Sequence, residues 1–107
     1  MLAWIYLAAA IATEIVGTVF LRFTDGFTRP APSTLVIATY AASLWLTALA
    51  LRELEISLVY AVWAGVGTAA VAVIGMAVLG ESVNVLKVAS IALVIGGVVG
   101  LNLSGAN

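Results

Sequence analysis

Long apolar stretches and short polar breaks alternate along this chain. The four apolar stretches are each about 20 residues long, which is the length that a helix needs to cross the hydrocarbon core of a bilayer. The pattern predicts an all-α integral membrane protein, with a single four-helix transmembrane domain over residues 1–107. The transmembrane helices are expected at residues 2–22, 33–51, 57–79 and 85–104.

The breaks between the stretches hold most of the polar side chains. The first break contains both prolines, Pro30 and Pro32, and proline interrupts a helix because it fixes φ and lacks an N–H donor. Every ionisable side chain except Glu14 lies at or near a break, where long side chains reach the headgroups. These residues are Arg22, Asp25, Arg29, Arg52, Glu53, Glu55, Glu81 and Lys87.

The composition excludes several classes of protein. Hydrophobic residues make up 64% of the chain and charged residues only 8%, whereas soluble domains carry about 25% charged residues. A soluble enzyme is therefore excluded, and a multi-pass membrane protein is expected. The chain has no cysteine and no histidine, which argues against disulfides, zinc and haem. A net charge of −1 offers no basic surface for nucleic acid.

Arginine and lysine are divided unevenly between the two membrane faces. Four spans place both termini on one side, so the first and third breaks share the other side. That side holds Arg22, Arg29 and Lys87, against Arg52 and the amino terminus. The positive-inside rule reads such an imbalance as an orientation signal, and this one is small. We therefore expect the chain to insert in both orientations.

One carboxylate, Glu14, lies inside the first apolar stretch. An acid at membrane depth costs about 2.5–3.5 kcal/mol on insertion scales, and it usually faces a protein interior or a water-filled cavity. The other apolar stretches supply no basic partner at that depth. The default interpretation is a functional site, and the alternative is a structural polar contact between helices.

Residues three, four and seven apart share one face of a helix. The face that carries Glu14 also carries Leu7, Ala10, Ile11, Gly17 and Thr18. Several of these residues are small, so they leave room for a ligand beside the acid or permit close helix packing. Spacing alone supports the two uses equally.

Polar and aromatic side chains recur at the same spacing in the next two stretches. They are Tyr40, Ser43 and Thr47 in the second, and Tyr60, Trp63 and Gly67 in the third. An aromatic face attracts a cation by about 0.5–2 kcal/mol, so these stripes are candidate walls of a cation site. Trp63 lies near the middle of its stretch, where an interfacial aromatic belt does not explain it. Its alternative roles are core packing and contact with lipid.

Small residues predict two further features. Gly65 and Gly67 form a candidate helix bend, because glycine destabilises a helix interior by up to about 1 kcal/mol and paired small residues are one cause of kinks. Ser90 and Gly97, seven residues apart, mark a smooth stripe that suits helix association. We expect an oligomer interface there, because four helices barely enclose a transport pathway and two opposed copies would recreate an inverted repeat.

Together these residues resemble the small multidrug resistance transporters. The resemblance extends from Tyr6 to Asn102, and its most specific elements are Glu14, Gly26-Phe27-Thr28-Arg29, Tyr40 and the run Tyr60-Ala61-Val62-Trp63-Ala64-Gly65-Val66-Gly67. It implies an antiparallel homodimer of four-helix subunits that exchanges protons for hydrophobic cations such as quaternary ammonium compounds. It implies no cofactor, because the proton gradient drives the exchange.

The resemblance also assigns roles by position. Glu14 would be shared by protons and substrate, while Tyr40, Tyr60 and Trp63 would line the pocket. The glycines at 65 and 67 would let one subunit differ from the other. Ser90 and Gly97 would fall in the dimer contact of the fourth helix.

The substrate branch depends on the residue one turn after the glutamate. Guanidinium exporters of the family carry a tryptophan there, whereas this chain has Gly17 followed by Thr18. The pattern looks like the promiscuous multidrug branch, with a guanidinium-selective exporter as the alternative. Ala64 replaces a serine and Trp4 a tyrosine that are common in the family, and each change alters one hydroxyl near the presumed pocket.

Other classes explain less of the sequence. A proton-ring subunit also uses one buried carboxylate, but such chains are usually two-helix hairpins and give the aromatic stripes no role. A non-transport membrane scaffold would leave those stripes unexplained as well. A heterodimer with a paired partner chain remains open.

Overall fold

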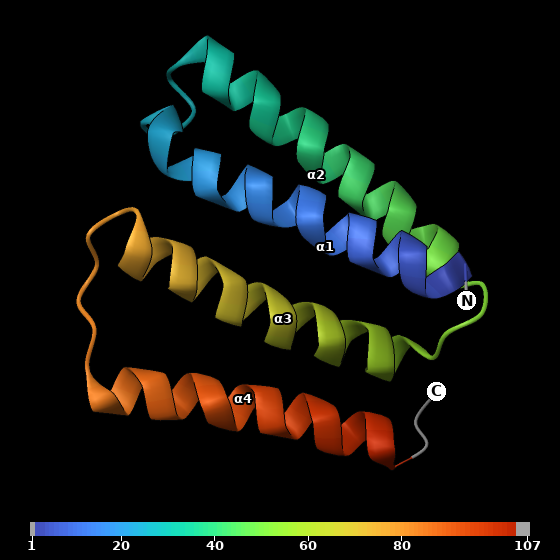
Figure 1. Ribbon diagram of the computed structural model, residues 1–107. Coiled ribbons are helices and arrows are strands. Elements are labelled where there is room, and N and C mark those ends of the chain that lie inside the picture. Colours follow the sequence, from blue (N-terminus) through green and yellow to red (C-terminus); the bar gives the residue numbers. More distant parts are fainter. Residues whose placement is uncertain (1, 105–107) are drawn as a thin grey trace. The chain divides into compact units, whose positions relative to one another are not determined.

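The computed structural model describes residues 2–104, so the ends of the predicted domain, at residue 1 and residues 105–107, lie outside the described residues. Residues 2–104 form four long helices and contain no strand, which confirms the predicted all-α membrane fold. The helices are α1 (Leu2–Leu21), α2 (Pro30–Ala50), α3 (Ile56–Ala77) and α4 (Val85–Leu103) (Figure 1). Each is long and apolar enough to cross a membrane, because 20 residues at a rise of 1.5 Å span about 30 Å.

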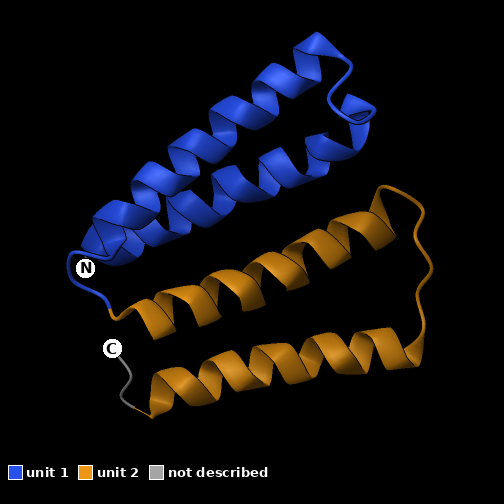
Figure 2. Ribbon diagram, turned by 180° about the vertical axis from the view of Figure 1, so that it is seen from behind, with its two compact units in different colours: residues 1–54 blue, residues 55–107 orange. Residues whose placement is uncertain are grey.

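The chain divides into two compact units, each of which is an antiparallel pair of helices (Figure 2). The first unit contains α1 and α2, and the second contains α3 and α4. In the first unit α1 packs closely against α2. The buried residues of the two helices are small or of medium size, which allows two apolar helices to approach closely. They are Ala3, Leu7, Ala10, Ile11 and Gly17 on α1, and Ser33, Val36, Ser43, Thr47 and Ala50 on α2.

A tight loop joins α1 to α2, and Thr24 is its centre. Thr24 ends a short 3-10 helix, η1 (Arg22–Thr24), and is 1% exposed. Its hydroxyl donates to the carbonyl of Leu21 at 2.8 Å and accepts from the N–H of Phe27 at 3.2 Å. The three residues after Thr24 have positive φ angles of 50°, 67° and 65°. Phe27 is the bulky one of the three, and such a residue adopts this conformation only where its surroundings enforce it.

The α2 helix begins at Pro30, three residues before the predicted start at residue 33. Proline suits the first helical turn because the N–H group that it lacks would have no intrahelical partner there. Arg29 is extended, with φ −96° and ψ 116°, as a residue before proline prefers. The first break is therefore shorter than the two prolines suggested, because they open the helix instead of preventing it.

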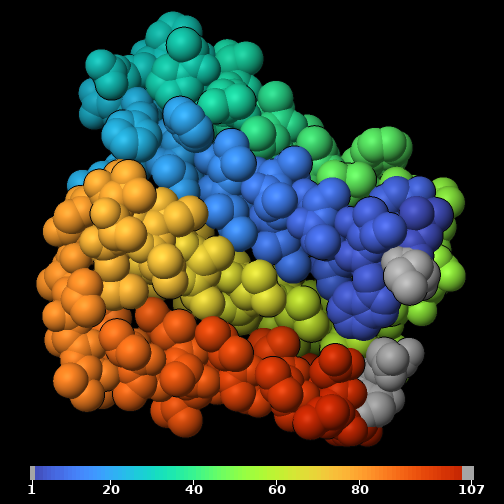
Figure 3. Space-filling view, in the orientation of Figure 1, coloured from blue at the N-terminus to red at the C-terminus, as the bar shows by residue number. Residues whose placement is uncertain are grey.

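In the second unit, α3 and α4 meet through a glycine. A Cβ atom built on Gly65 would collide with Cγ2 of Val98 on α4 and would lie 3.6 Å from Cγ1 of Val94. Glycine thus permits a close approach that any larger residue would prevent. None of the residues of α4 is buried, and its side chains are open to view along its length in Figure 3.

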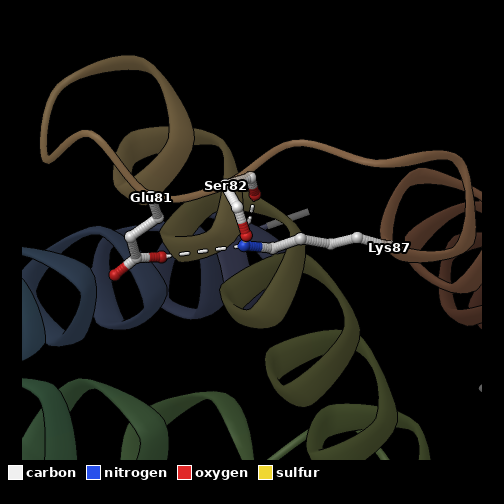
Figure 4. A network of polar contacts seen from close by, with 3 residues as sticks. All are labelled: Glu81, Ser82 and Lys87. Atoms are coloured by element: carbon white, nitrogen blue, oxygen red, sulfur yellow. Dashed lines mark hydrogen bonds and ion pairs between the residues drawn. The ribbon is translucent and has the colours of Figure 1, made fainter.

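A polar network closes the turn between α3 and α4. Asn84 caps α4, because its side-chain oxygen accepts from the backbone N–H of Lys87 at 2.8 Å. The Lys87 ammonium group donates to the carbonyl of Ser82 at 3.1 Å and lies 3.9 Å from Oε1 of Glu81 (Figure 4). The Glu81 carboxylate in turn occupies the space beside Gly75, where a Cβ atom would collide with it. These contacts fix the path of the turn.

Candidate functional site

Glu14 lies in the middle of α1, with both helix ends more than one turn away. Its side chain is half-buried. The hydroxyl of Thr18, one turn later on the same helix, donates a hydrogen bond of 2.7 Å to Oε1 of Glu14. This contact follows from helix geometry, because residues four apart are neighbours on the helix surface. The carboxylate is therefore met by a neutral donor.

Tyr40 extends this contact from α1 to α2. Its hydroxyl lies 2.7 Å from the hydroxyl of Thr18. A threonine hydroxyl has one hydrogen, and Thr18 gives that hydrogen to Glu14. The hydrogen between the two hydroxyls therefore comes from Tyr40. The result is a chain of two hydrogen bonds that runs from Tyr40 through Thr18 to the carboxylate.

Gly17 makes room for the ring of Tyr40. A Cβ atom built on Gly17 would lie 2.7 Å from Cε1 and 2.8 Å from Cδ1 of Tyr40, and 2.5 Å from the Thr39 hydroxyl oxygen. Carbon atoms do not approach so closely, so a side chain at this position would displace the ring. Within this unit, the small residue beside the acid therefore serves close packing, one of the two uses that spacing had left open.

Ser43 makes a second link from α2 to α1. Its buried hydroxyl donates a hydrogen bond of 2.7 Å to the backbone carbonyl of Ala10, one turn before Glu14. Thr13 also directs its hydroxyl to that carbonyl, at 3.0 Å. The hydroxyl of Ser43 is thus used within the helix pair, and the place of this residue in the pocket stays a prediction.

The remaining predicted residues of the α1 face are buried. Leu7 is 1% exposed, Ile11 is 6% exposed and Ala10 is fully covered. The spacing placed all of them on the same face as Glu14, and their pocket role stays a prediction.

The predicted aromatic residues Tyr60 and Trp63 lie together on α3. Their ring centroids are 6.5 Å apart and the rings are inclined by 59°. Tyr60 is 67% exposed and Trp63 is half-buried. Gly65 and Gly67 follow on the same helix and are both buried. The α-helix continues through them from Ile56 to Ala77, so the bend stays a prediction.

The two residues of the predicted dimer contact lie on α4. Ser90 and Gly97 are both exposed, and a Cβ atom on Gly97 would meet no atom within 4 Å. Their exposure leaves this stripe available to another helix. Among residues 2–104, no group of three or more His, Cys, Asp or Glu side chains is placed to hold a metal ion.

The fold and this site together define a small multi-pass membrane protein with one polar chain built around an acid in its first helix. A family model described as "Small Multidrug Resistance protein" matches residues 2–94. The chain belongs to the small multidrug resistance family, whose members are membrane transporters. It is an exporter of the plasma membrane, which it crosses several times.

Three relatives illustrate the range of the family. The chain is 48% identical over 102 residues to the nicotine metabolites export pump subunit NepB of Paenarthrobacter nicotinovorans, and the match covers 95% of this chain but 61% of that relative. It is 44% identical to the uncharacterized membrane protein YvaE of Bacillus subtilis, covering 94% and 84% of the two chains. It is 40% identical to the guanidinium exporter of Escherichia coli K12, covering 96% and 98%.

Proposed function

We propose that this protein is a proton-coupled antiporter that exports hydrophobic cations, including quaternary ammonium compounds. Glu14 would bind a proton and the cationic substrate alternately. The observation that carries the proposal is the environment of Glu14: a half-buried carboxylate at mid-span whose hydrogen-bond donor is the neutral hydroxyl of Thr18. A neutral donor stabilises the anion without cancelling its charge, so the anion retains its attraction for a proton or a cation.

The working unit would be an antiparallel homodimer. The exposed stripe with Ser90 and Gly97 on α4 supports a helix contact between copies, because small residues let membrane helices approach closely. The small difference in arginine and lysine between the two faces supports insertion in both orientations.

The residues that would contact the substrate are those of the Glu14 face of α1, together with Tyr40, Tyr60 and Trp63. The pairing of the two aromatic rings on α3 supports this assignment, since an organic cation binds favourably over an aromatic face. Gly65 and Gly67 would supply the bend through which the two copies differ. A proton on one face of the membrane would displace the cation from Glu14, and the reverse step would follow on the other face.

Two alternatives each have a specific observation in their favour. A relative that is 40% identical is named a guanidinium exporter, so guanidinium is the second candidate substrate. Another is named as a subunit of an export pump for nicotine metabolites, so the partner could be a different chain. The guanidinium exporters of the family carry a tryptophan one turn after the glutamate, whereas this chain has Gly17 there, and this difference favours the multidrug branch.

Transport by purified protein in liposomes tests the proposal. Vesicles with an acidic interior, diluted into alkaline buffer, should take up tetraphenylphosphonium and a small tetraalkylammonium ion. Uptake of either cation should be accompanied by release of protons from the vesicles. Protein-free vesicles are the control for passive entry. Uptake of guanidinium alone would establish the alternative substrate, and proton-independent uptake of every cation would refute the antiporter.

A further inference from the structure

We propose that Thr18 and Tyr40 are positioning residues for Glu14. Their hydroxyls form a relay that holds the ionised carboxylate and reverses when a proton binds Oε1 of Glu14. Gly17 has no side chain, and this leaves the space that the Tyr40 ring needs to take part in the relay. This inference rests on the proposed function, because it concerns the competition between a proton and a cation for binding to Glu14.

In the ionised state every donor of the relay points toward the acid. Tyr40 donates to Thr18 over 2.7 Å, and Thr18 donates to Oε1 of Glu14 over 2.7 Å. Hydrogen bonds to an ionised acceptor are stronger than those between neutral groups, and bonds in series polarise one another. The relay therefore favours the anion, and its removal favours the protonated carboxyl.

A proton on Oε1 turns that oxygen from an acceptor into a donor. The bond to Thr18 then survives only if the Thr18 hydroxyl rotates, so that it accepts from Glu14 and donates its hydrogen to the oxygen of Tyr40. The hydrogen of Tyr40 turns away from Thr18 in the same step. No covalent bond of either hydroxyl breaks, since both groups act as donor or acceptor by rotation. The orientation of the Tyr40 hydroxyl thus depends on whether Oε1 carries the proton, because a proton on Oε2 leaves Oε1 an acceptor and the relay unchanged.

The close contact at Gly17 keeps this relay in place. The ring of Tyr40 lies where a side chain at position 17 would be, and the Ser43–Ala10 bond pins α2 to α1 one turn before the acid. Tyr40 is the only titratable residue that α2 contributes opposite Glu14. On α1 the other titratable residue is Tyr6, and Arg22 follows the last turn. The relay is therefore the one polar route between α2 and the carboxylate in this unit, among the contacts of the described residues.

The test is the pH dependence of tetraphenylphosphonium binding to the purified full-length protein. We expect the pH of half-maximal binding to move to higher pH by about one unit in Thr18→Val, because a hydrogen bond to a charged group is worth about tenfold in an equilibrium. Tyr40→Phe should move it in the same direction by less, because Tyr40 bonds the neutral hydroxyl of Thr18 and reaches the carboxylate only through it. Thr18→Ser should stay at the wild-type midpoint, since it keeps the hydroxyl. The double variant should shift no further than Thr18→Val alone, because Tyr40 acts on the carboxylate only through Thr18.

Two matched variants control for loss of a hydroxyl elsewhere on α1. Thr13→Val removes a hydroxyl that bonds the backbone of its own helix, and Tyr6→Phe removes one that lies outside the relay. Both should keep the wild-type midpoint. Gly17→Ala should behave as Tyr40→Phe, because its methyl group displaces the ring. If Thr18→Val does not fold, the comparison of Tyr40→Phe with Tyr6→Phe decides the question.

The outcomes separate this inference from the proposed function. If wild-type binding depends on pH and Glu14→Gln loses that dependence, while Tyr40→Phe and Thr18→Val keep the wild-type midpoint, the relay is refuted and the antiporter stands. Additive shifts in the double variant would also overturn the relay, because they would mean that the two hydroxyls act separately. If Glu14→Gln keeps the pH dependence, Glu14 is not the coupling group and both proposals fail.

Discussion

The hydroxyl of Ser43 donates to the backbone carbonyl of Ala10 across the contact between α1 and α2. Both residues are buried, with exposed fractions of 2% and 0%. The bond therefore lies in a place where neither water nor lipid replaces it well. It holds α2 to the turn of α1 that precedes Glu14.

Ser43→Ala is expected to destabilise the protein by about 0.5–1.5 kcal/mol, because it removes one buried hydrogen bond while Thr13 still donates to the Ala10 carbonyl. Thermal unfolding in detergent, or loss of tetraphenylphosphonium binding on heating, measures the effect. Ser33→Ala is the matched control. Its hydroxyl oxygen is buried without a hydrogen-bond partner, so its removal should leave stability unchanged or raise it. Equal destabilisation by the two variants would contradict this role of Ser43.

Glu14→Gln should abolish proton-coupled exchange while the protein still folds and inserts. The amide keeps the size and polarity of the carboxyl group but cannot take up a proton. Uptake of a cationic dye into vesicles with a proton gradient is the measurement, and the yield of folded protein is the control. Glu14→Asp should retain part of the activity with an altered pH dependence, because its carboxylate lies about one carbon further from Thr18. Exchange at the wild-type rate in Glu14→Gln would contradict the assignment of Glu14 as the proton-coupling residue.

Gly65→Ala should loosen the packing of α3 on α4, since its methyl group would collide with Val98. We expect a loss of about 1–3 kcal/mol, which is typical of overpacking in a close contact. Val98→Ala should recover much of that loss when the two changes are combined. A double-mutant cycle on thermal stability measures the coupling. Strictly additive effects would show that the two residues do not meet in the membrane.

Trp63→Phe should weaken binding of large aromatic cations more than binding of small alkylammonium ions. The smaller ring has a weaker quadrupole and less contact area, so the loss is about 1 kcal/mol, or several-fold in affinity. Titrations with tetraphenylphosphonium and a small tetraalkylammonium ion, at a pH that keeps Glu14 ionised, measure it. An equal loss for both ligands, parallel to a fall in thermal stability, would leave Trp63 with a packing role alone.

A carboxyl-terminal reporter that is active on only one side of the membrane should detect both orientations of the chain. The physical reason is the small difference in Lys and Arg between the two faces. Adding lysines to one loop should drive the population to one orientation, which provides the control. A uniform orientation in the unmodified protein would rule out the antiparallel homodimer and leave a heterodimer as the remaining antiparallel form.

The number and nature of the helices followed directly from the sequence, because a membrane span needs only length and apolar composition. The start of α2 did not, since Pro30 is compatible with a first helical turn as well as with a break. The Glu14–Thr18 contact was within reach of the sequence, because the two residues are four apart. The contacts of Gly17 with Tyr40 and of Ser43 with Ala10 were not. Both contacts depend on the axial register of α1 relative to α2. Helices that are apolar on all sides carry no sequence pattern that sets this register.

The open surface of α4 has a consequence for how the protein behaves in a bilayer. Lipid tails are as apolar as leucine, so a helix without buried side chains loses little when lipid replaces its neighbours. The association of α4 with a second copy of the chain should then follow mass action, like that of any weak complex. Diluting the protein into excess lipid should separate the copies while α1 and α2 of each chain stay together. The ratio of protein to lipid, more than temperature, would decide how much of the transporter is assembled.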